Sequence, residues 1–379
     1  MKGCVRKAVF SAFMLLALRA PSLLAEEQAG NSNQSQNPGS KVKQNLPDDE
    51  QRWAIFPVIA SSPETGQMLG GMLFYFFPVA EQGKQASTVD TMVFGTTKGQ
   101  YLLRFSPNVF FDSGRYRLNA MVERSIWQAN YYGVGPDSPE VAEKYKTSSL
   151  QGSLTLERRF GDAIVLDIIG VYDKSRITLQ SGGTLQAGHV LGAADSTLNG
   201  MGVEGGYDTR DNTNAPTEGV VAKYRYLNYN TGLGSDLAFS QQNWDFRYFT
   251  KTDWIKESVM AFSGTVRRAY GDVPFRYLSS PDGTLILRGI ENGRYRDNDM
   301  LALQSELRVP IQGRFSGTIF AEAGKVAHTL GDVGASHFIS SVGVGFRYAL
   351  NPDQRFNVRG DVAWVDHGIG VIINVREAF

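Results

Sequence analysis

The chain has 379 residues, with 38 basic and 38 acidic side chains and no net formal charge. This balance gives no basic surface for nucleic acid, so we expect no nucleic-acid partner. The 41 glycines, 16 tyrosines and 22 phenylalanines favour an all-β protein over a helical one, and the length allows one large barrel or two ordinary domains.

The first 25 residues have the pattern of an export signal. Three basic residues precede an apolar stretch over 8–18, which is too short to span a membrane. We therefore predict a signal peptide over 1–25; the alternative is a short buried helix. Cys4, the only cysteine, lies in this segment, so we expect the mature chain to have no disulfide, thiol nucleophile or cysteine metal site.

Residues 26–51 are polar and rich in Gln, Asn, Ser and Lys. Such a segment cannot bury enough apolar surface to order itself. We expect a disordered periplasmic tail that is too short to hold a folded accessory domain.

Alternating polar and apolar residues recur from residue 52 to the end, and no run of 18 apolar residues follows the signal. Segments of about ten residues suit strands that cross a bilayer at a tilt. The predicted strands, sixteen in number, are 52–61, 67–78, 88–97, 100–110, 115–126, 144–159, 163–177, 199–211, 219–229, 239–250, 257–267, 300–310, 313–326, 338–350, 354–364 and 369–379.

The strand over 300–310 shows the two faces most clearly. Its polar face holds Ala302, Gln304, Glu306 and Arg308, and its apolar face holds Leu301, Leu303, Ser305, Leu307 and Val309. Strand side chains alternate with period 2, so this pattern predicts lipid outside and a polar lumen inside. The alternative is a soluble β-sandwich, but aromatic residues near strand ends favour the girdle of a membrane barrel.

Connection lengths predict the orientation. Most even-numbered connections are tight, whereas odd-numbered ones over 128–143, 178–198 and 268–299 are long. Outer-membrane barrels have short periplasmic turns and long outer loops. We therefore predict an antiparallel transmembrane β-barrel over 52–379 in a bacterial outer membrane, with both termini in the periplasm.

Four pieces of the sequence resemble one known family. They are Leu287-Arg288-Gly289-Ile290, Phe320-Ala321-Glu322-Ala323-Gly324, the turn from Gly206-Tyr207-Asp208-Thr209-Arg210-Asp211-Asn212 to Pro216-Thr217-Glu218-Gly219, and the chain end at Phe379. Together they resemble the BamA/TamA-type outer-membrane assembly and translocation barrels, also called bacterial surface antigens. Ile290 stands where that family has an aromatic residue, and Glu322 where it has Asp. The chain resembles a barrel-only member that lacks the periplasmic POTRA domains.

The Arg-Gly piece falls in the sixth outer loop, where the family places it. A guanidinium is a planar fork suited to carboxylates, and Glu322 and Phe320 share one strand face, so both can contact Arg288. Gly289 permits a close approach of the backbone. We expect this loop to fold into the lumen, held by a loop lock of Arg288, Gly289, Ile290, Phe320, Glu322 and Gly324. The alternative is an exposed arginine with solvent partners.

The first and last strands are expected to form a weak seam. Pro57 cannot donate to a ladder and belongs at an edge or a bulge, while Gly368 and Gly370 weaken the final strand. In a closed barrel these strands pair, so the weak elements meet. We hypothesise a lateral seam that can part, as the resemblance also implies; the alternative is an ordinary seam with a bulge at Pro57.

Two further sites follow from the turn and the chain end. Asp208, Arg210 and Asp211 are expected to form an ionic cluster at a periplasmic turn that Pro216 and Gly219 shape. The resemblance implies that Phe379 is an assembly signal recognised by the barrel-assembly machinery, which is compatible with a place in the aromatic girdle.

Enzymatic motifs are missing from the sequence. It contains no Gly-x-Ser-x-Gly elbow, no His-Glu-x-x-His pair and no phosphate-cradling loop, and its four histidines lack metal-ligand spacing. We expect no enzyme activity, cofactor or metal.

The expected function is insertion or translocation of proteins or lipids at the outer membrane through the seam, and the alternative is a passive, porin-like diffusion channel. The expected partners are outer-membrane lipid, the barrel-assembly machinery and a protein or lipid client.

Overall fold

A computed structural model describes residues 52–62, 66–77, 87–179, 183–185, 189–281, 286–334, 337–352, 355–366 and 368–379. The predicted signal peptide over 1–25 and tail over 26–51 lie outside these described residues. No helix in the described ranges is long and apolar enough to cross a membrane.

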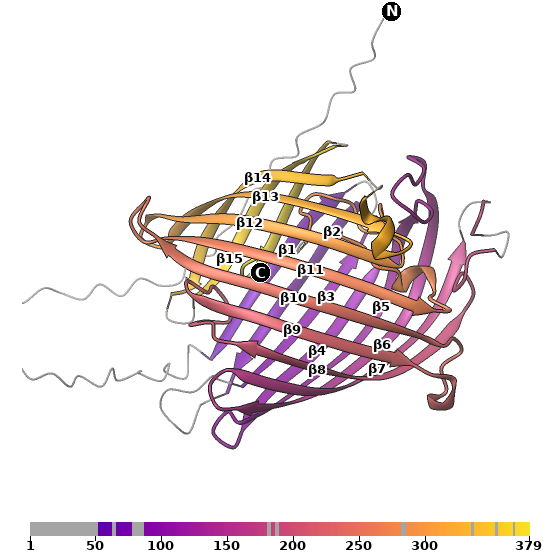
Figure 1. Cartoon of the computed structure of the whole chain (residues 1–379), viewed down its shortest axis with the longest axis horizontal. Coiled ribbons are helices and arrows are strands. Elements are labelled where there is room, and N and C mark those ends of the chain that lie inside the picture. The colour runs from indigo at the N-terminus through magenta and orange to yellow at the C-terminus, as the bar shows by residue number, and fades with distance from the viewer. Residues whose placement is uncertain are drawn as a thin grey trace, which may run out of the picture. The chain divides into compact units, whose positions relative to one another are not determined.

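Sixteen strands follow one another in chain order in a single antiparallel sheet that curls into a barrel (Figure 1). They are β1 (Trp53–Ser62), β2 (Gly66–Phe76), β3 (Thr88–Thr96), β4 (Tyr101–Phe111), β5 (Tyr116–Tyr131), β6 (Glu143–Phe160), β7 (Ile164–Leu179), β8 (Ser196–Asp208), β9 (Gly219–Tyr229), β10 (Phe239–Thr252), β11 (Ser258–Gly271), β12 (Asp299–Gln312), β13 (Phe315–Ala327), β14 (Ile339–Asn351), β15 (Phe356–Val365) and β16 (Gly368–Val375). The predicted all-β, antiparallel, sixteen-stranded fold is confirmed.

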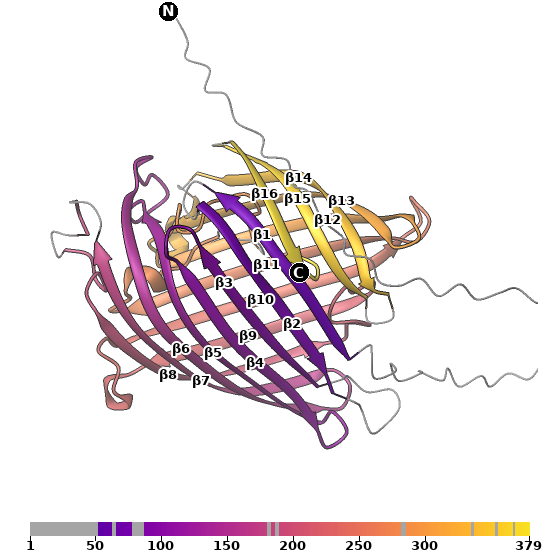
Figure 2. The ribbon, with the colours of Figure 1, turned by 180° about the vertical axis from the view of Figure 1, so that it is seen from behind.

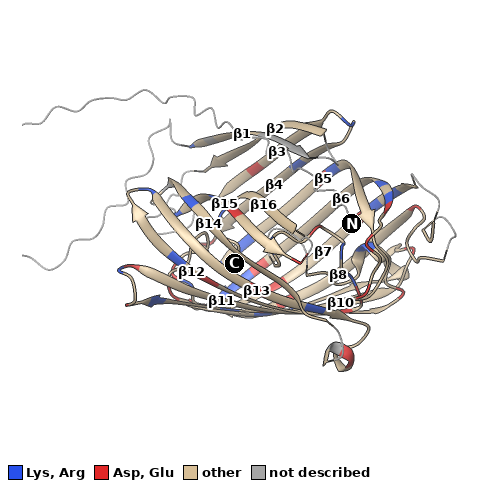
Figure 3. Cartoon of the chain, turned by 90° about the horizontal axis from the view of Figure 1, so that it is seen from above, with Lys and Arg blue, Asp and Glu red and all other residues tan. Residues whose placement is uncertain are grey.

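The strands alternate between an inner and an outer face, as their sequence pattern predicts. On β12 the predicted inward residues Gln304, Glu306 and Arg308 are buried, whereas Leu303 on the other face is 57% exposed. On β7, Asp167 is buried and its neighbour Ile168 is 56% exposed. Such exposed aliphatic side chains suit contact with lipid, while the charges face the lumen. Figure 3 shows basic and acidic positions interspersed along the strands.

Several predicted strand boundaries are wrong. β5 continues to Tyr131 rather than ending at residue 126, β11 continues to Gly271 rather than ending at 267, and β8 covers Ser196–Asp208 rather than 199–211. β16 ends at Val375 instead of running to Phe379. The physical reason at β16 is a left-handed residue, Arg376 with φ of 64°, which turns the chain out of the strand direction.

The first and last strands do not form a ladder in the described part of the chain. The sheet runs from β1, paired with β2, to β16, paired with β15, so the expected closing pair is not formed (Figure 2). Side chains contact each other across this gap, which we call the seam. The rings of Phe74 on β2 and Phe356 on β15 lie 5.6 Å apart, and Arg376 lies 3.9 Å from Asp90 on β3.

Long connections cover one end of the barrel, which we call the loop end. Tyr131 and Tyr145 of β5 and β6 pack there against Leu185 from the connection over 180–195 and Phe275 from the connection over 272–298. A β-bridge between Gly135 and Arg296 joins two of these connections. The opposite end carries the even-numbered turns and is called the turn end.

Candidate functional site

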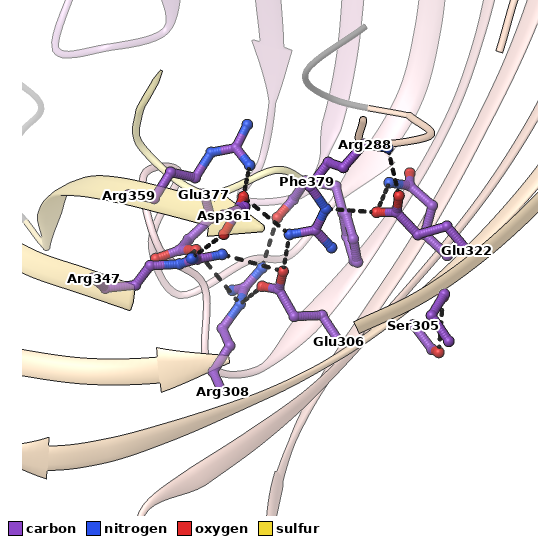
Figure 4. Close-up of polar contacts among 12 residues, drawn as sticks. Arg288, Ser305, Glu306, Arg308, Glu322, Arg347, Arg359, Asp361, Glu377 and Phe379 are labelled. Carbon is purple, nitrogen blue, oxygen red and sulfur yellow. Dashed lines mark hydrogen bonds and ion pairs between the residues drawn. The ribbon is translucent and has the colours of Figure 1, made fainter. Parts of the chain in front are cut away.

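The connection between β11 and β12 turns back into the barrel and buries Arg288 completely (Figure 4). Its apolar neighbours Leu287 and Ile290 pack against Met300 and Val326 at the β12 and β13 strands. Burying one such side chain contributes about 1.5–3 kcal/mol, so apolar packing helps to hold the connection inside. The predicted inward fold of this loop is confirmed, and an exposed Arg288 is excluded by its burial.

Glycines make this close packing possible. Gly289 has φ of 87°, a left-handed conformation that glycine adopts at little cost. A Cβ on Gly324 would lie 3.1 Å from Leu287 Cδ1 and 3.1 Å from the carbonyl oxygen of Leu301. Gly324 therefore leaves room for Leu287. Ile290, at the family's aromatic position, is 7% exposed within the same apolar cluster.

Arg288 contacts both residues that the sequence pattern placed near it. Its Nε donates to Glu322 Oε1 at 2.7 Å, and its backbone N donates to Glu322 Oε2 at 2.6 Å. Its guanidinium carbon lies 3.4 Å from the centroid of the Phe320 ring, in position for a cation–π contact. One carboxylate thus binds both the side chain and the backbone of Arg288.

Three further partners of Arg288 were missed by sequence reasoning. Its Nη1 lies 2.7 Å from Glu306 Oε2 and 3.3 Å from Asp361 Oδ2, and Ser341 Oγ donates to its carbonyl oxygen at 2.6 Å. The period-2 pattern placed Glu306 and Asp361 on inward faces. It could not bring them together, because β12 and β15 converge on Arg288 only through the curvature of the barrel.

Arg288 belongs to a larger luminal charge cluster. Its members are four arginines and four carboxylates: Arg288, Arg308, Arg347, Arg359, Glu306, Glu322, Asp361 and Glu377 (Figure 4). Glu306 accepts from Arg308 Nε at 2.7 Å and from Arg347 Nη2 at 3.3 Å. Asp361 accepts from Arg347 and Arg359, each at 2.5 Å. With equal numbers of each sign the cluster is formally neutral, which matters because an unpartnered buried charge is costly.

The three residues predicted for the seam lie on the two edge strands of the described sheet, which do not pair with each other. Pro57 is on β1, the first edge of the sheet, and Gly368 opens β16 with φ of 142°. Gly370 is more than a weak point in β16. It packs directly against Gly289 of the buried connection, so its missing side chain makes room for the loop.

The predicted ionic cluster at the β8–β9 turn separates into two parts. Arg210 forms a two-pronged pair with Asp208, at 2.9 and 2.7 Å. Asp211 instead accepts from the backbone N and the Oγ1 of Thr217, at 2.9 and 2.7 Å, and from Arg355 Nη1 at 2.5 Å. Burial alone would raise the pKa of Asp211, but the hydrogen bonds from Thr217 and Arg355 outweigh it and lower the pKa to about 2.

The other two turn residues act through the backbone. Pro216 accepts a hydrogen bond at its carbonyl oxygen from Arg308 Nη1 at 3.1 Å, which ties the turn to the luminal charge cluster. Gly219 has φ of 118°, and a Cβ there would lie 2.5 Å from the carbonyl oxygen of Thr209. A side chain at Gly219 would therefore disrupt the turn.

Phe379 does not lie in the aromatic girdle, which corrects that expectation. The chain turns inward at Arg376, and Phe379 packs beside Phe249 and Val221 with only 6% of its surface exposed. Its carbonyl oxygen accepts from Arg308 Nη2 at 3.0 Å. Its role as an assembly signal stays a prediction.

A polar cavity of about 400 Å³ occupies another part of the lumen. Residues of β5 to β11 line it, among them the charged residues Arg117, Asp167, Glu204 and Lys223. Glu204 accepts from Lys223 at 3.2 Å and from Arg225 at 2.6 Å, so acidic and basic groups partly neutralise each other there.

Comparison with known proteins agrees with this architecture. Residues 85–366 match the Omp85 superfamily domain. Similar solved structures include BamA from Haemophilus ducreyi lacking POTRA domains 1–3, with TM-score 0.55, 15% identity, and coverage of 86% of this chain and 69% of that chain. CdiB from Acinetobacter baumannii has TM-score 0.54 and 13% identity, with coverage of 86% of this chain but only 60% of CdiB. At these identities the structures show the fold alone. Comparison with curated proteins gave no match.

Proposed function

Because the chain belongs to the Omp85 superfamily of outer-membrane β-barrels, we propose that it assists the insertion or translocation of proteins or lipids at the bacterial outer membrane. The observation that carries this proposal is the seam. β1 and β16 are the two edges of the described sheet, and they face each other without a ladder between them. The proposed role is one of binding and passage, without catalysis, cofactor or metal.

An open seam supports passage because of what strand edges offer. An edge presents backbone N–H and C=O groups that can pair with another extended chain. Among the described residues, side chains contact each other across the seam, Phe74 with Phe356 and Arg376 with Asp90, while no ladder joins β1 to β16. Such side-chain contacts cost less to separate than a full ladder of hydrogen bonds. The proposed route is therefore sideways, between β1 and β16, from the lumen into the membrane.

The loop lock supports this route over one along the barrel axis. Arg288 holds the β11–β12 connection inside the lumen, and the connections at the loop end pack on one another. The second candidate, a passive diffusion channel, is favoured by the polar cavity of about 400 Å³. It is the weaker candidate because these buried segments occupy the space that solutes would need.

The remaining elements of the proposal concern orientation and partners. The long connections at one end and the short turns at the other support periplasmic termini. We propose that the partners are outer-membrane lipid, a protein or lipid client, and the barrel-assembly machinery for insertion of this chain itself. The seam would be the surface that a client contacts.

Deleting the gene and measuring the protein and lipid content of the outer membrane tests the proposal. We expect a defined subset of outer-membrane proteins or lipids to decrease, and re-expression of the wild-type chain to restore it. An unchanged inventory, with slower uptake of small solutes, would contradict the proposal and support the diffusion channel.

A further inference from the structure

The buried connection and the last strand touch backbone to backbone. A Cβ built on Gly370 of β16 would overlap the Cα of Gly289, and it would lie 3.0 Å from the carbonyl oxygen and 3.1 Å from the carbonyl carbon of Gly289. Backbone atoms cannot move aside as a flexible side chain can. Only glycine at position 370 leaves room for the loop in this place.

Gly289 is equally confined on its own side. A Cβ on it would lie 2.9 Å from Ala363 Cβ, 3.2 Å from Val365 Cγ1 and 3.5 Å from Gly370 Cα, and its φ of 87° already disfavours other residues. The loop therefore packs closely against the inner face of β15 and β16, and glycines form both sides of the closest contact.

The same loop is fixed to the rest of the barrel by Arg288. The Arg288 side chain bonds to Glu306 on β12, Glu322 on β13 and Asp361 on β15. Its partners therefore belong to the interior of the sheet, while the next residue, Gly289, reaches the edge strand β16. Two adjacent residues thus connect the charged lock to the seam.

The position of β16 makes this contact consequential. In the described sheet β16 pairs only with β15, over eight residues from Gly368 to Val375. A strand held on one side by a short ladder can pivot. With the loop seated against its inner face, β16 cannot move into the lumen without overlapping Gly289.

We propose that Gly370 is a positioning residue that couples the loop lock to the seam. While Arg288 holds the loop in place, Gly289 stops β16 from moving inward and so sets the distance between β1 and β16. When the loop leaves its seat, β16 is free to move. The biological purpose of this coupling rests on the proposed function. The coupling itself does not, because it is a contact within the barrel.

Such a linkage is reciprocal, which makes it testable from both sides. A change at Gly370 must disturb the loop, and a change at Arg288 must move β16. In the purified barrel, Ile55 on β1 and Val371 on β16 are outward and exposed, so each can be replaced by a cysteine that carries a nitroxide label. Cys4 is replaced by serine. Pulsed EPR between the two labels then measures the β1–β16 distance. Trypsin cleavage after Arg288, which is fully buried, reports release of the loop.

Gly370→Ala is the first variant and Gly360→Ala is its matched control. Gly360 lies on β15, and a Cβ there meets nothing within 4 Å. We expect Gly370→Ala to shift the distance between labels 55 and 371 and to remove the protection of Arg288 from trypsin, while Gly360→Ala changes neither. Wild-type behaviour of a folded Gly370→Ala barrel in both measurements would overturn the proposal.

Arg288→Ala is the second variant. If Gly370→Ala does not fold, Arg288→Ala alone tests the coupling. Loop release is then read from trypsin cleavage after Arg294. We expect the distance between the labels to shift together with loop release. Release of the loop with an unchanged distance would overturn the coupling. Because both readouts use purified protein, an unchanged outer-membrane inventory after gene deletion would refute the proposed function and leave this coupling standing.

Discussion

Replacing Arg288 with alanine is expected to lower the free energy of unfolding of the barrel by about 3–5 kcal/mol, the usual cost of removing one partner from a buried ion pair. The variant leaves Glu306, Glu322 and Asp361 buried without the guanidinium that three of their oxygens contact. Urea unfolding of the folded barrel in lipid vesicles, followed by tryptophan fluorescence, measures the change.

A matched control separates burial from charge in this experiment. Arg104 also pairs with a luminal carboxylate, Glu123, but 39% of its side chain is exposed. Exposed pairs contribute about 0–1 kcal/mol, so Arg104→Ala should have a small effect. Arg288→Lys should fall between the two, because a lysine keeps the charge but cannot bridge two carboxylates as a planar fork does. Equal stabilities for Arg288→Ala and Arg104→Ala would contradict the buried-lock account.

Replacing Glu306 with alanine is expected to be about as damaging, again on the order of 3–5 kcal/mol. Glu306 is fully buried, and its two oxygens contact Arg288, Arg308 and Arg347. Without it the three guanidiniums repel one another, and the cluster gains a net positive charge in a poorly solvated place. The same unfolding measurement applies, with Glu306→Gln included to separate the loss of charge from the loss of volume.

A double-mutant cycle shows whether Arg288 and Glu306 act together. Each single alanine variant leaves the other residue of the pair buried without its partner, whereas the double variant removes both residues. The loss of stability in the double variant should therefore be smaller than the sum of the two single losses. Additive losses would mean that the two residues stabilise the barrel independently, contrary to the contact of 2.7 Å between them.

Local patterns in the sequence predict the wall of the barrel well, for a physical reason. The strand period of 2 depends on nearest neighbours alone, so the buried face of β12 follows directly from its residues. The pairing of Arg288 with Glu322 needed more than one strand, because Arg288 lies in a connection outside β13. The family resemblance singled out the two pieces of sequence, and the period of 2 added that Glu322 and Phe320 share one face.

Features that join distant segments could not be derived in this way. Asp361 reaches Arg288 across 73 positions in the chain, through the curvature of the sheet. The left-handed turn at Arg376 has neither glycine nor proline to mark it, so the sequence pattern predicts a last strand that is too long. The sequence pattern indicates only a weak point at Gly370, because its neighbour in the fold, Gly289, comes from a connection 81 positions away.

The central claim is that the seam between β1 and β16 must open for function, and a reversible lock tests it directly. In a Cys4→Ser background, one cysteine within 55–58 and one within 371–374 form a disulfide that locks the seam when oxidised. The control has cysteines at Ile55 and Leu73, which pair on the neighbouring strands β1 and β2. The measurement is the outer-membrane protein and lipid inventory of the deletion strain that carries each variant. We predict that the oxidised seam lock fails to restore the inventory, that reductant reverses the failure, and that the control restores it throughout. Full restoration by the oxidised, locked barrel would contradict the account.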